Sequence, residues 1–170
     1  SLFGTVPFVG DGLAEWVMGD VVPSGATLGR FFALHAVGVP LVLLLFVAVH
    51  VAALRQAFAD AQAKGWFIEA VFLEPVMGEG DPGRSVPVEF YAAAREATRA
   101  HGSLLLVDSI QAGLRVHGVL SLVDYPGFEG VEPPDMETYS KALNAAQFPL
   151  SVLAVTAHAA ALYRKGVYGN

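Results

Sequence analysis

The side chains that could do chemistry in the second half of the chain are acids, one amide and one lysine, held in three short motifs. Asp108 follows the apolar run LLLV and opens DSIQAG, which also contains Gln111. Glu74 and Glu79 lie in the glycine-rich EPVMGEG, and Lys141 lies in YSKAL. A carboxylate at the end of a buried strand needs a cation, a dipole or water to offset its desolvation. Taken singly, such a lysine is usually solvated and such loops usually only turn the chain.

Two histidines form a second group of candidates, in the first half of the chain. His35 and His50 lie in an apolar stretch without charged residues. On one helix, fifteen residues of separation place them about 22 Å apart along the axis and about 60° apart around it. They therefore cannot share one metal ion, but they could contact two cofactors stacked along a membrane normal. Two histidines in an apolar helix can also be purely structural.

The elements that would position the first group form an α/β pattern. Residues 103–113, SLLLVDSIQAG, predict a strand buried on both faces, with Asp108 at its carboxyl end, where open α/β sheets bind ligands. Other strands are predicted at 67–76, 136–140 and 150–156, and helices at 56–64, 87–101 and 157–165. This alternation predicts an α/β fold with a partial parallel sheet of three to four strands and flanking helices.

A long apolar helix is predicted to precede the sheet. Residues 31–54 contain no Lys, Arg, Asp or Glu, and twenty-four helical residues span about 36 Å, enough to cross a bilayer. Arg30 and Arg55 bracket the stretch, so its charges give no orientation. Gly38 and Pro40 should distort the helix, which membrane helices tolerate. A buried core helix is the alternative, and the length disfavours it.

Composition limits the partners of the chain. Apolar residues make up 54% of its 170 residues and charged residues 15%, which is unusually apolar for a soluble protein. The net charge of −6, without a Lys/Arg run, argues against nucleic acid. The absence of cysteine excludes disulfides, thiolate zinc sites and cysteine nucleophiles. An exposed apolar surface of this size predicts a protein partner, self-association or a membrane.

Together, the three motifs of the second half resemble the class III aminotransferases, pyridoxal-phosphate enzymes related to ornithine and acetylornithine aminotransferase. The resemblance runs from about residue 54 to residue 170. It implies that Lys141 is the Schiff-base lysine and that Asp108 pairs with the cofactor's pyridinium nitrogen. It also implies that Gln111 lies near the phenolic oxygen and that Glu74 and Glu79 shape the floor of the site. The implied cofactor is pyridoxal phosphate.

Several positions depart from this family pattern. Ser109 stands where a glutamate commonly follows the aspartate, LRVHG replaces the usual Gly-Arg-Thr-Gly ending, and residues 144–147 replace a glycine run. The family's phosphate-binding turn, its ring-stacking aromatic residue and its C-terminal domain have no counterpart in these residues. We therefore expect an incomplete site that retains the lysine and aspartate pair but does not catalyse transamination alone.

The first 54 residues resemble a different family, cytochrome b of the quinol-oxidising complexes. The resemblance rests on SLFGTVPFVGDGLAEWVMGD and on the entry TLGRFFALH, with a proline five residues after His35 and a second histidine at His50. It implies a loop and the fourth transmembrane helix, with each histidine an axial ligand of one haem. The partner ligands come from an earlier helix, so we expect no haem to be held by this chain alone.

Two unrelated families thus meet near residues 51–55, inside one helical stretch and without a linker, although natural fusions usually join whole domains through exposed segments. We predict a chimera, engineered, generated or rearranged, with a cytochrome-b-like region at 1–54 and a truncated aminotransferase-like region at 55–170. Three functions stay open. They are an aminotransferase-like fragment that binds pyridoxal phosphate, a membrane haem fragment, and a non-enzymatic binding module of inhibitor or antitoxin type. The sequence leaves the cellular location open between the cytoplasm and a membrane.

Overall fold

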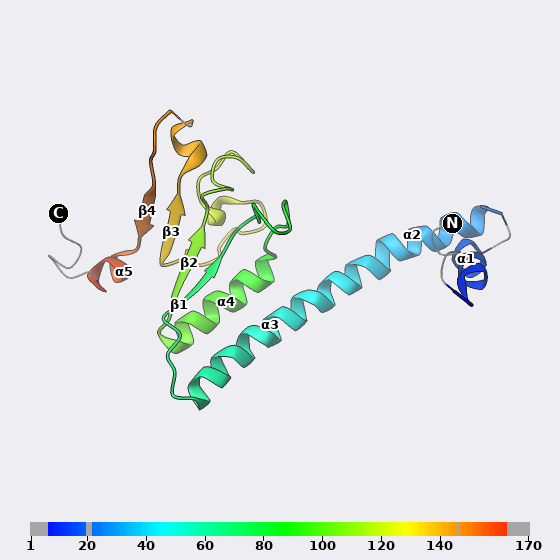
Figure 1. The fold of residues 1–170 in the computed structure, drawn as a ribbon, viewed down its shortest axis with the longest axis horizontal. Helices are drawn as coiled ribbons and strands as arrows, with labels where there is room; N and C mark the ends of the chain where they lie inside the picture. The colour runs from blue at the N-terminus through cyan, green and yellow to red at the C-terminus, as the bar shows by residue number, and fades with distance from the viewer. Residues whose placement is uncertain (1–6, 20–21, 146, 163–170) are drawn as a thin grey trace. The chain divides into compact units, whose positions relative to one another are not determined.

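The structure, a computed structural model, describes residues 7–19, 22–145 and 147–162. The chain divides into two compact units, residues 1–48 and 49–170, and each is described by itself. The helices are α1 (Gly10–Met18), α2 (Gly25–Ala33), α3 (Val39–Ala63), α4 (Val88–His101) and α5 (Ala157–Leu162), and the strands are β1 (Ala70–Leu73), β2 (Leu104–Asp108), β3 (Met136–Tyr139) and β4 (Val152–Val155) (Figure 1). A π-helical turn spans Leu34–Gly38, and 3-10 turns span Leu122–Asp124 and Lys141–Asn144.

In the first unit, the residues that cap the start of α2 also contact the end of α1. Ser24 is the N-cap of α2 and its backbone N–H donates to Thr27 Oγ1 at 2.9 Å, while the Thr27 hydroxyl donates to the carbonyl of Met18 at 2.5 Å. These bonds satisfy backbone groups that helix ends leave unpaired. The π-helical turn follows α2, where Gly38 and Pro40 predicted a distortion. The N–H of Val39 bonds to the carbonyl of Leu34, five residues back, which accommodates a proline that has no N–H to donate.

The apolar helix does not end where the composition changes. The sequence predicted that the apolar helix and the more polar helical residues 56–64 meet inside one helical stretch, and α3 continues through Arg55 to Ala63 as one helix. Gly65, with a φ of +70°, follows its end. The predicted change of region at residues 54–55 is therefore a change of composition within one continuous helix, because residues 55–63 are themselves good helix formers.

The sheet has the strand order β1-β2-β3-β4 (Figure 1). Strands β1, β2 and β3 are parallel, with Leu73 opposite Val107 and Asp108 opposite Thr138. Strand β4 is antiparallel to β3, so the sheet is mixed. The α/β class and the strand number are confirmed. The connection from β3 to β4, residues 140–151, contains a 3-10 turn and no α-helix among its described residues, and it returns the chain antiparallel beside β3.

One face of the sheet carries the main core. Helix α4 packs against β1 and β2, and Tyr91 meets Leu105 and Val107 in a cluster that the loop residues Leu122, Tyr125 and Phe128 complete. On the other face, the second buried cluster is smaller: Ala159 of α5 packs against Leu106 and Met136, with Leu104 beside them. Phe72 on that face remains 69% exposed. The carboxyl ends of β1–β3 therefore rest on a core that is well packed on one side.

A buried ion pair ties α4 to the chain before β3. The Arg95 guanidinium donates to both oxygens of Asp135, at 2.6 and 3.1 Å, and the two residues are 4% and 1% exposed. The Asp135 carboxylate also accepts the backbone N–H of Leu105 in β2 at 2.8 Å. Burial alone would raise the pKa of Asp135, but the hydrogen bonds from Arg95 and Leu105 outweigh it and hold that pKa below its usual value. The Arg95–Asp135 pair thus joins α4, the central strand β2 and the segment that precedes β3.

Candidate functional site

Asp108 lies at the carboxyl end of β2, as the sequence predicted. Its Oδ1 accepts two hydrogen bonds at 3.1 Å, one from the Thr138 hydroxyl on β3 and one from the backbone N–H of Ile110. Its Oδ2 has no hydrogen-bond partner among the described residues. The side chain is half-buried. One oxygen is thus held by the sheet, and the other is available to a donor from outside.

Lys141 follows β3, the neighbour of β2, and stands three residues beyond Thr138, the partner of Asp108 in the sheet. Its backbone φ of +44° lies in the left-handed region, which costs a non-glycine residue about 1–2 kcal/mol. Such strain often marks functional sites. The side chain is exposed and forms no ion pair within the described part of the chain. The sheet therefore brings the lysine and the aspartate to the same edge.

Gln111 and the loop after β1 meet at this edge too. A Cβ placed on Gly78 would lie 2.4 Å from Cγ of Gln111, so only a glycine admits the glutamine side chain there. The Glu74 carboxylate turns back and accepts the backbone N–H of Gly78 at 3.0 Å. The side-chain amide oxygen of Gln111, Oε1, in turn accepts a hydrogen bond from the Arg115 guanidinium at 3.2 Å. Glu74 thus holds the loop that supports Gln111.

For the remaining candidates, the structure shows no contact with Asp108, Gln111 or Lys141 among the described residues. Glu79 is exposed, and its side chain forms no hydrogen bond or ion pair with another described residue. His35 lies in the π-helical turn and His50 in α3, where its ring meets Phe90 edge-on with centroids 6.4 Å apart. Within the residues that the structure describes, no group of three or more metal-ligating side chains occurs. The roles of these residues stay predictions.

Two polar residues of β3 at this edge escaped the sequence analysis. Thr138 holds Asp108, and Glu137, 4% exposed, accepts hydrogen bonds from Ser109 and Ser121. Burial, and then the charge of Glu137, raise the pKa of the neighbouring Tyr139 hydroxyl well above its usual value. The signal was an acid inside a short strand of apolar and β-branched residues, in METY. Its partners could not be read without the register of β2 and β3.

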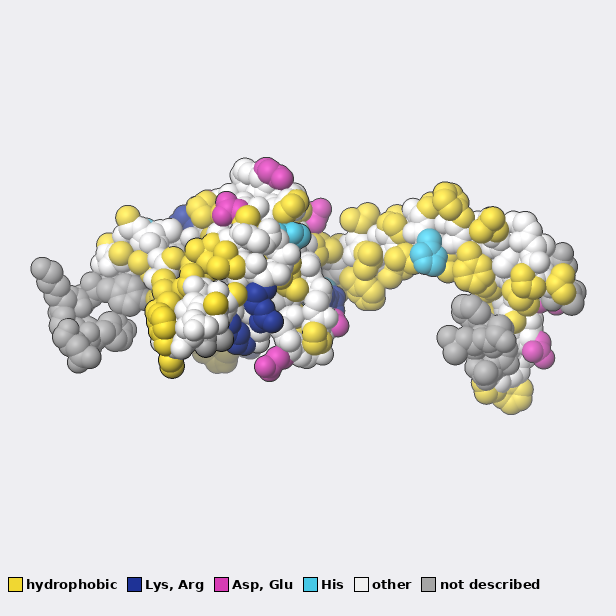
Figure 2. Space-filling model, turned by 90° about the horizontal axis from the view of Figure 1, so that it is seen from above, with side chains coloured by type: hydrophobic (Ala, Val, Ile, Leu, Met, Phe, Trp, Pro, Cys, Tyr) yellow, Lys and Arg dark blue, Asp and Glu magenta, His cyan; other side chains and the backbone are white. Residues whose placement is uncertain are grey.

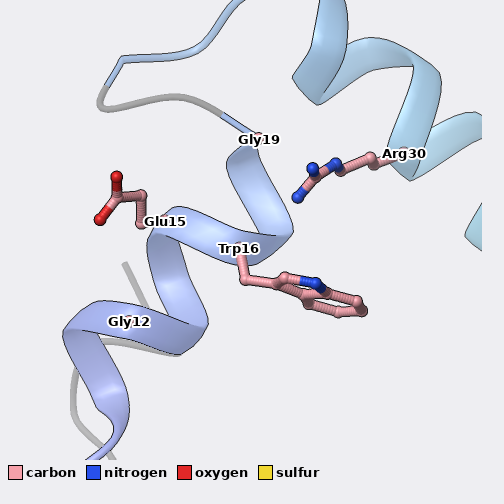
Figure 3. A pocket seen from close by; sticks show the side chains of 5 residues that line it. All are labelled: Gly12, Glu15, Trp16, Gly19 and Arg30. Atoms are coloured by element: carbon pink, nitrogen blue, oxygen red, sulfur yellow. The ribbon is translucent and has the colours of Figure 1, made fainter.

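The first unit contains an open hollow of about 320 Å³. Its lining is Gly12, Glu15, Trp16, Gly19 and Arg30 (Figure 3). The Arg30 guanidinium lies 5.8 Å from the centre of the Trp16 ring, and Figure 3 shows Glu15 pointing away from Arg30. A Cβ on Gly19 would lie 2.9 Å from Nε of Arg30, so the glycine makes room for the guanidinium.

Comparisons with known proteins assign the two parts of the chain to different families. Residues 46–170 match the model of class III aminotransferases, and residues 1–65 match the model of the N-terminal part of cytochrome b/b6. The chain is 38% identical over 102 residues to acetylornithine aminotransferase of Mycobacterium leprae, covering 59% of this chain and 24% of that protein. It is 50% identical over 55 residues to cytochrome b of Allochromatium vinosum, covering 32% of this chain and 13% of that protein.

Solved structures agree with the first of these matches. Ornithine aminotransferase of Toxoplasma gondii has 32% identity and a TM-score of 0.57 over 71% of this chain and 26% of its own. The chain thus spans about a quarter of the length of the aminotransferases it resembles. The sheet, its strand-end residues and the family match over most of the chain agree. The chain therefore belongs to the class III aminotransferase family, and it is a chimera whose N-terminal segment is of cytochrome b type.

Proposed function

We propose that the aminotransferase segment binds pyridoxal phosphate through Lys141 and Asp108. The observation that carries this proposal is the pair of strand ends. Asp108 has one oxygen held by Thr138 and one without a partner among the described residues, and Lys141 follows the next parallel strand with a strained backbone. A ligand at this edge would meet both residues, because parallel strands end together. The solved ornithine aminotransferase of Toxoplasma gondii is described with partial occupancy of pyridoxal phosphate.

The residues present fit the chemistry of that group. When bound, pyridoxal phosphate supplies an aldehyde that condenses with a primary amine and a ring that withdraws electrons. Lys141 is the amine, which reacts in its neutral form. Asp108 would favour protonation of the ring nitrogen, because a carboxylate beside it stabilises the pyridinium charge. Gln111, fixed by Gly78, closes the side of the edge toward β1. Transamination itself is proposed only for an assembly in which another chain supplies the parts of the aminotransferase fold that the longer relatives contain.

The test is covalent capture of the cofactor. The full chain in mild detergent is mixed with pyridoxal phosphate, and the lysine adduct is reduced with borohydride and located by peptide mass. We expect the label on Lys141, and Lys141→Ala should abolish the adduct's visible absorbance. Lys64→Ala, which removes another exposed lysine, is the matched control and should keep it. A label spread equally over Lys64 and Lys141 would show only the unselective reaction of accessible amines.

A second function is proposed for the first part of the chain, which is insertion of the apolar helix into a bilayer. One helix of the described residues is long and apolar enough to cross a membrane, Gly25–Ala63, and none of its most apolar window is buried. The consecutive residues 41–46 are all exposed and apolar, so apolar side chains face every side of the helix there. Figure 2 shows such side chains, in yellow, along the face in view. A protein groove would cover one stripe of a helix, whereas lipid covers every side. Trp16 and Arg30 stand where interfacial aromatic and basic anchors occur.

The origin of the chimera is proposed to be a join inside α3. The two family matches overlap at residues 46–65, and α3 runs through most of this overlap as one helix without a linker. If both parent segments are helical at the junction, the helix continues across it without a break. The chain can then fold locally at the junction. Sequencing of source DNA across the codons for residues 46–65 tests this. We expect one uninterrupted reading frame in a rearranged or engineered gene, whereas separate loci would indicate an assembly artefact.

A further inference from the structure

We propose that Glu137 is a positioning residue that holds the segment 109–122 against β3 and thereby sets Asp108 and Gln111 in register with Lys141. This inference rests on the proposed function for its purpose, but its structural basis is independent of any cofactor. Glu137 is 4% exposed and forms no ion pair among the described residues. A buried carboxylate without a cation requires hydrogen-bond donors around it.

Three donors from the two ends of one segment surround the carboxylate, and the Tyr139 hydroxyl of β3 lies beside it. Ser109 donates its hydroxyl to Oε1 at 2.5 Å, directly after Asp108. Ser121 donates its hydroxyl to Oε2 at 2.6 Å, and the backbone N–H of Leu122 donates to Oε1 at 3.2 Å. Hydrogen bonds to a charged group are stronger than neutral ones. One side chain of β3 therefore closes the segment into a loop whose ends cannot separate from the strand.

The same strand holds the start of the segment from its other face. Successive residues of a strand point to opposite faces, so Glu137 binds Ser109 on the core face while Thr138 binds Asp108 on the other. The backbone N–H of Ser109 also donates to the carbonyl of Thr138 at 3.0 Å. Lys141 lies four residues after Glu137 on this strand's continuation. The positions of Asp108 and Lys141 are thus both set by β3, because Thr138 of that strand bonds to Asp108 and Lys141 follows its end.

Inside the loop, close packing transmits the constraint to Gln111. A Cβ on Gly113 would lie 2.8 Å from the carbonyl oxygen of Ser109 and 3.4 Å from the Tyr139 ring. The backbone N–H of Gly113 donates to that same carbonyl at 2.8 Å, which forms a tight turn around Gln111. A loop packed this closely on β3 has no room to shift independently of Glu137.

The test compares substitutions that remove acceptors by degrees. Glu137→Met removes all three acceptor contacts in a side chain of similar length. Glu137→Gln keeps one oxygen, and the Ser121 hydroxyl can turn to accept from the amide. Hydrogen exchange of residues 109–122 is measured on the full chain without cofactor, and the affinity for pyridoxal phosphate is measured from the absorbance of the lysine adduct. Glu96→Met, at an exposed acid of α4, is the matched control.

We expect Glu137→Met to raise exchange in residues 109–122 selectively and to weaken cofactor affinity about tenfold, since one to two kcal/mol of buried hydrogen bonding is lost. Glu137→Gln should recover most of both, and Glu96→Met should change neither. If Glu137→Met fails to fold, Ser109→Ala gives the same comparison with one bond removed.

Unchanged exchange in residues 109–122 for Glu137→Met and Ser109→Ala would overturn the inference whatever the cofactor does. An adduct on the unmodified chain with equal affinity in these variants would overturn the positioning role alone. A chain that forms no adduct would instead refute the proposed function, and the exchange comparison would still decide whether Glu137 holds the segment.

Discussion

Replacing Arg95 by methionine is expected to lower the free energy of unfolding by about 3–5 kcal/mol, as removal of one partner from a buried ion pair does. Asp135, 1% exposed, would lose the two hydrogen bonds from the guanidinium and keep only the Leu105 N–H at 2.8 Å and the half-exposed Arg99 at 3.5 Å to offset its buried charge. Urea unfolding of the full chain in mild detergent, followed by tryptophan fluorescence and circular dichroism, measures the change. Because Asp135 also contacts β2, the loss should appear in the sheet and not only in α4.

The loss should depend on pH in a defined direction. The Asp135 carboxyl has a folded pKa below its unfolded value of 3.8, so it contributes stability above that value, and the contribution is lost as pH falls through the folded pKa. In Arg95→Met the burial of Asp135 no longer has the guanidinium to offset it, so its pKa should rise. The variant then recovers part of its deficit when the carboxyl is protonated. The difference between the two proteins should therefore be largest near neutral pH and shrink in acid.

An exposed ion pair provides the control for this substitution. Arg84 and Asp81 are bonded at 3.3 Å, but both side chains are more than half exposed. Arg84→Met should therefore change stability by less than about 0.5–1 kcal/mol. Equal losses from Arg84→Met and Arg95→Met, or a deficit in Arg95→Met that is the same at every pH, would contradict the role assigned to the Arg95–Asp135 pair.

The sequence was sufficient for the parts of the fold that depend on local pattern. The apolar run before Asp108 marked the central strand, because a strand buried on both faces needs apolar side chains on both. The helix before it was recognisable from Pro87 and Glu89 at its start and from Gly102, which ends it with a φ of +69°. Asp108 and Lys141 were selected from their motifs; the structure places Asp108 at the end of β2 and Lys141 after the end of the neighbouring β3, while their roles stay predictions.

What the sequence could not supply depends on pairing across long separations. Glu137 and Ser109 are 28 residues apart, and their contact follows from the offset between β2 and β3, which no local pattern specifies. The antiparallel direction of β4 likewise depends on how the short connection turns. The continuity of α3, by contrast, could be predicted, because the junction near residues 51–55 lies inside one helical stretch. Arg55 changes the polarity of the surface, but arginine and the residues after it favour helix as much as the leucines before it.

Two adjacent arginines in the middle of the apolar helix should release the chain from a bilayer. Leu43 and Leu44 are both exposed and lie near the centre of the uncharged stretch 31–54. An arginine at the centre of a membrane helix costs about 2.5–3.5 kcal/mol, so Leu43→Arg with Leu44→Arg should weaken membrane partitioning at least a thousandfold. Co-sedimentation of the purified full chain with phosphatidylcholine vesicles measures this.

The matched control places the same two charges on exposed apolar residues outside the helix. Trp66 and Phe67 are exposed and follow the end of α3, so Trp66→Arg with Phe67→Arg should leave sedimentation with vesicles unchanged. If the unsubstituted chain stays in the supernatant and forms a defined oligomer or a stoichiometric complex with one protein, then protein, and not lipid, covers the helix. Equal release by both double variants would point to adhesion of the whole apolar surface. Release by the helix variant alone is the result that a membrane-spanning helix requires, because only there do the charges enter the hydrocarbon.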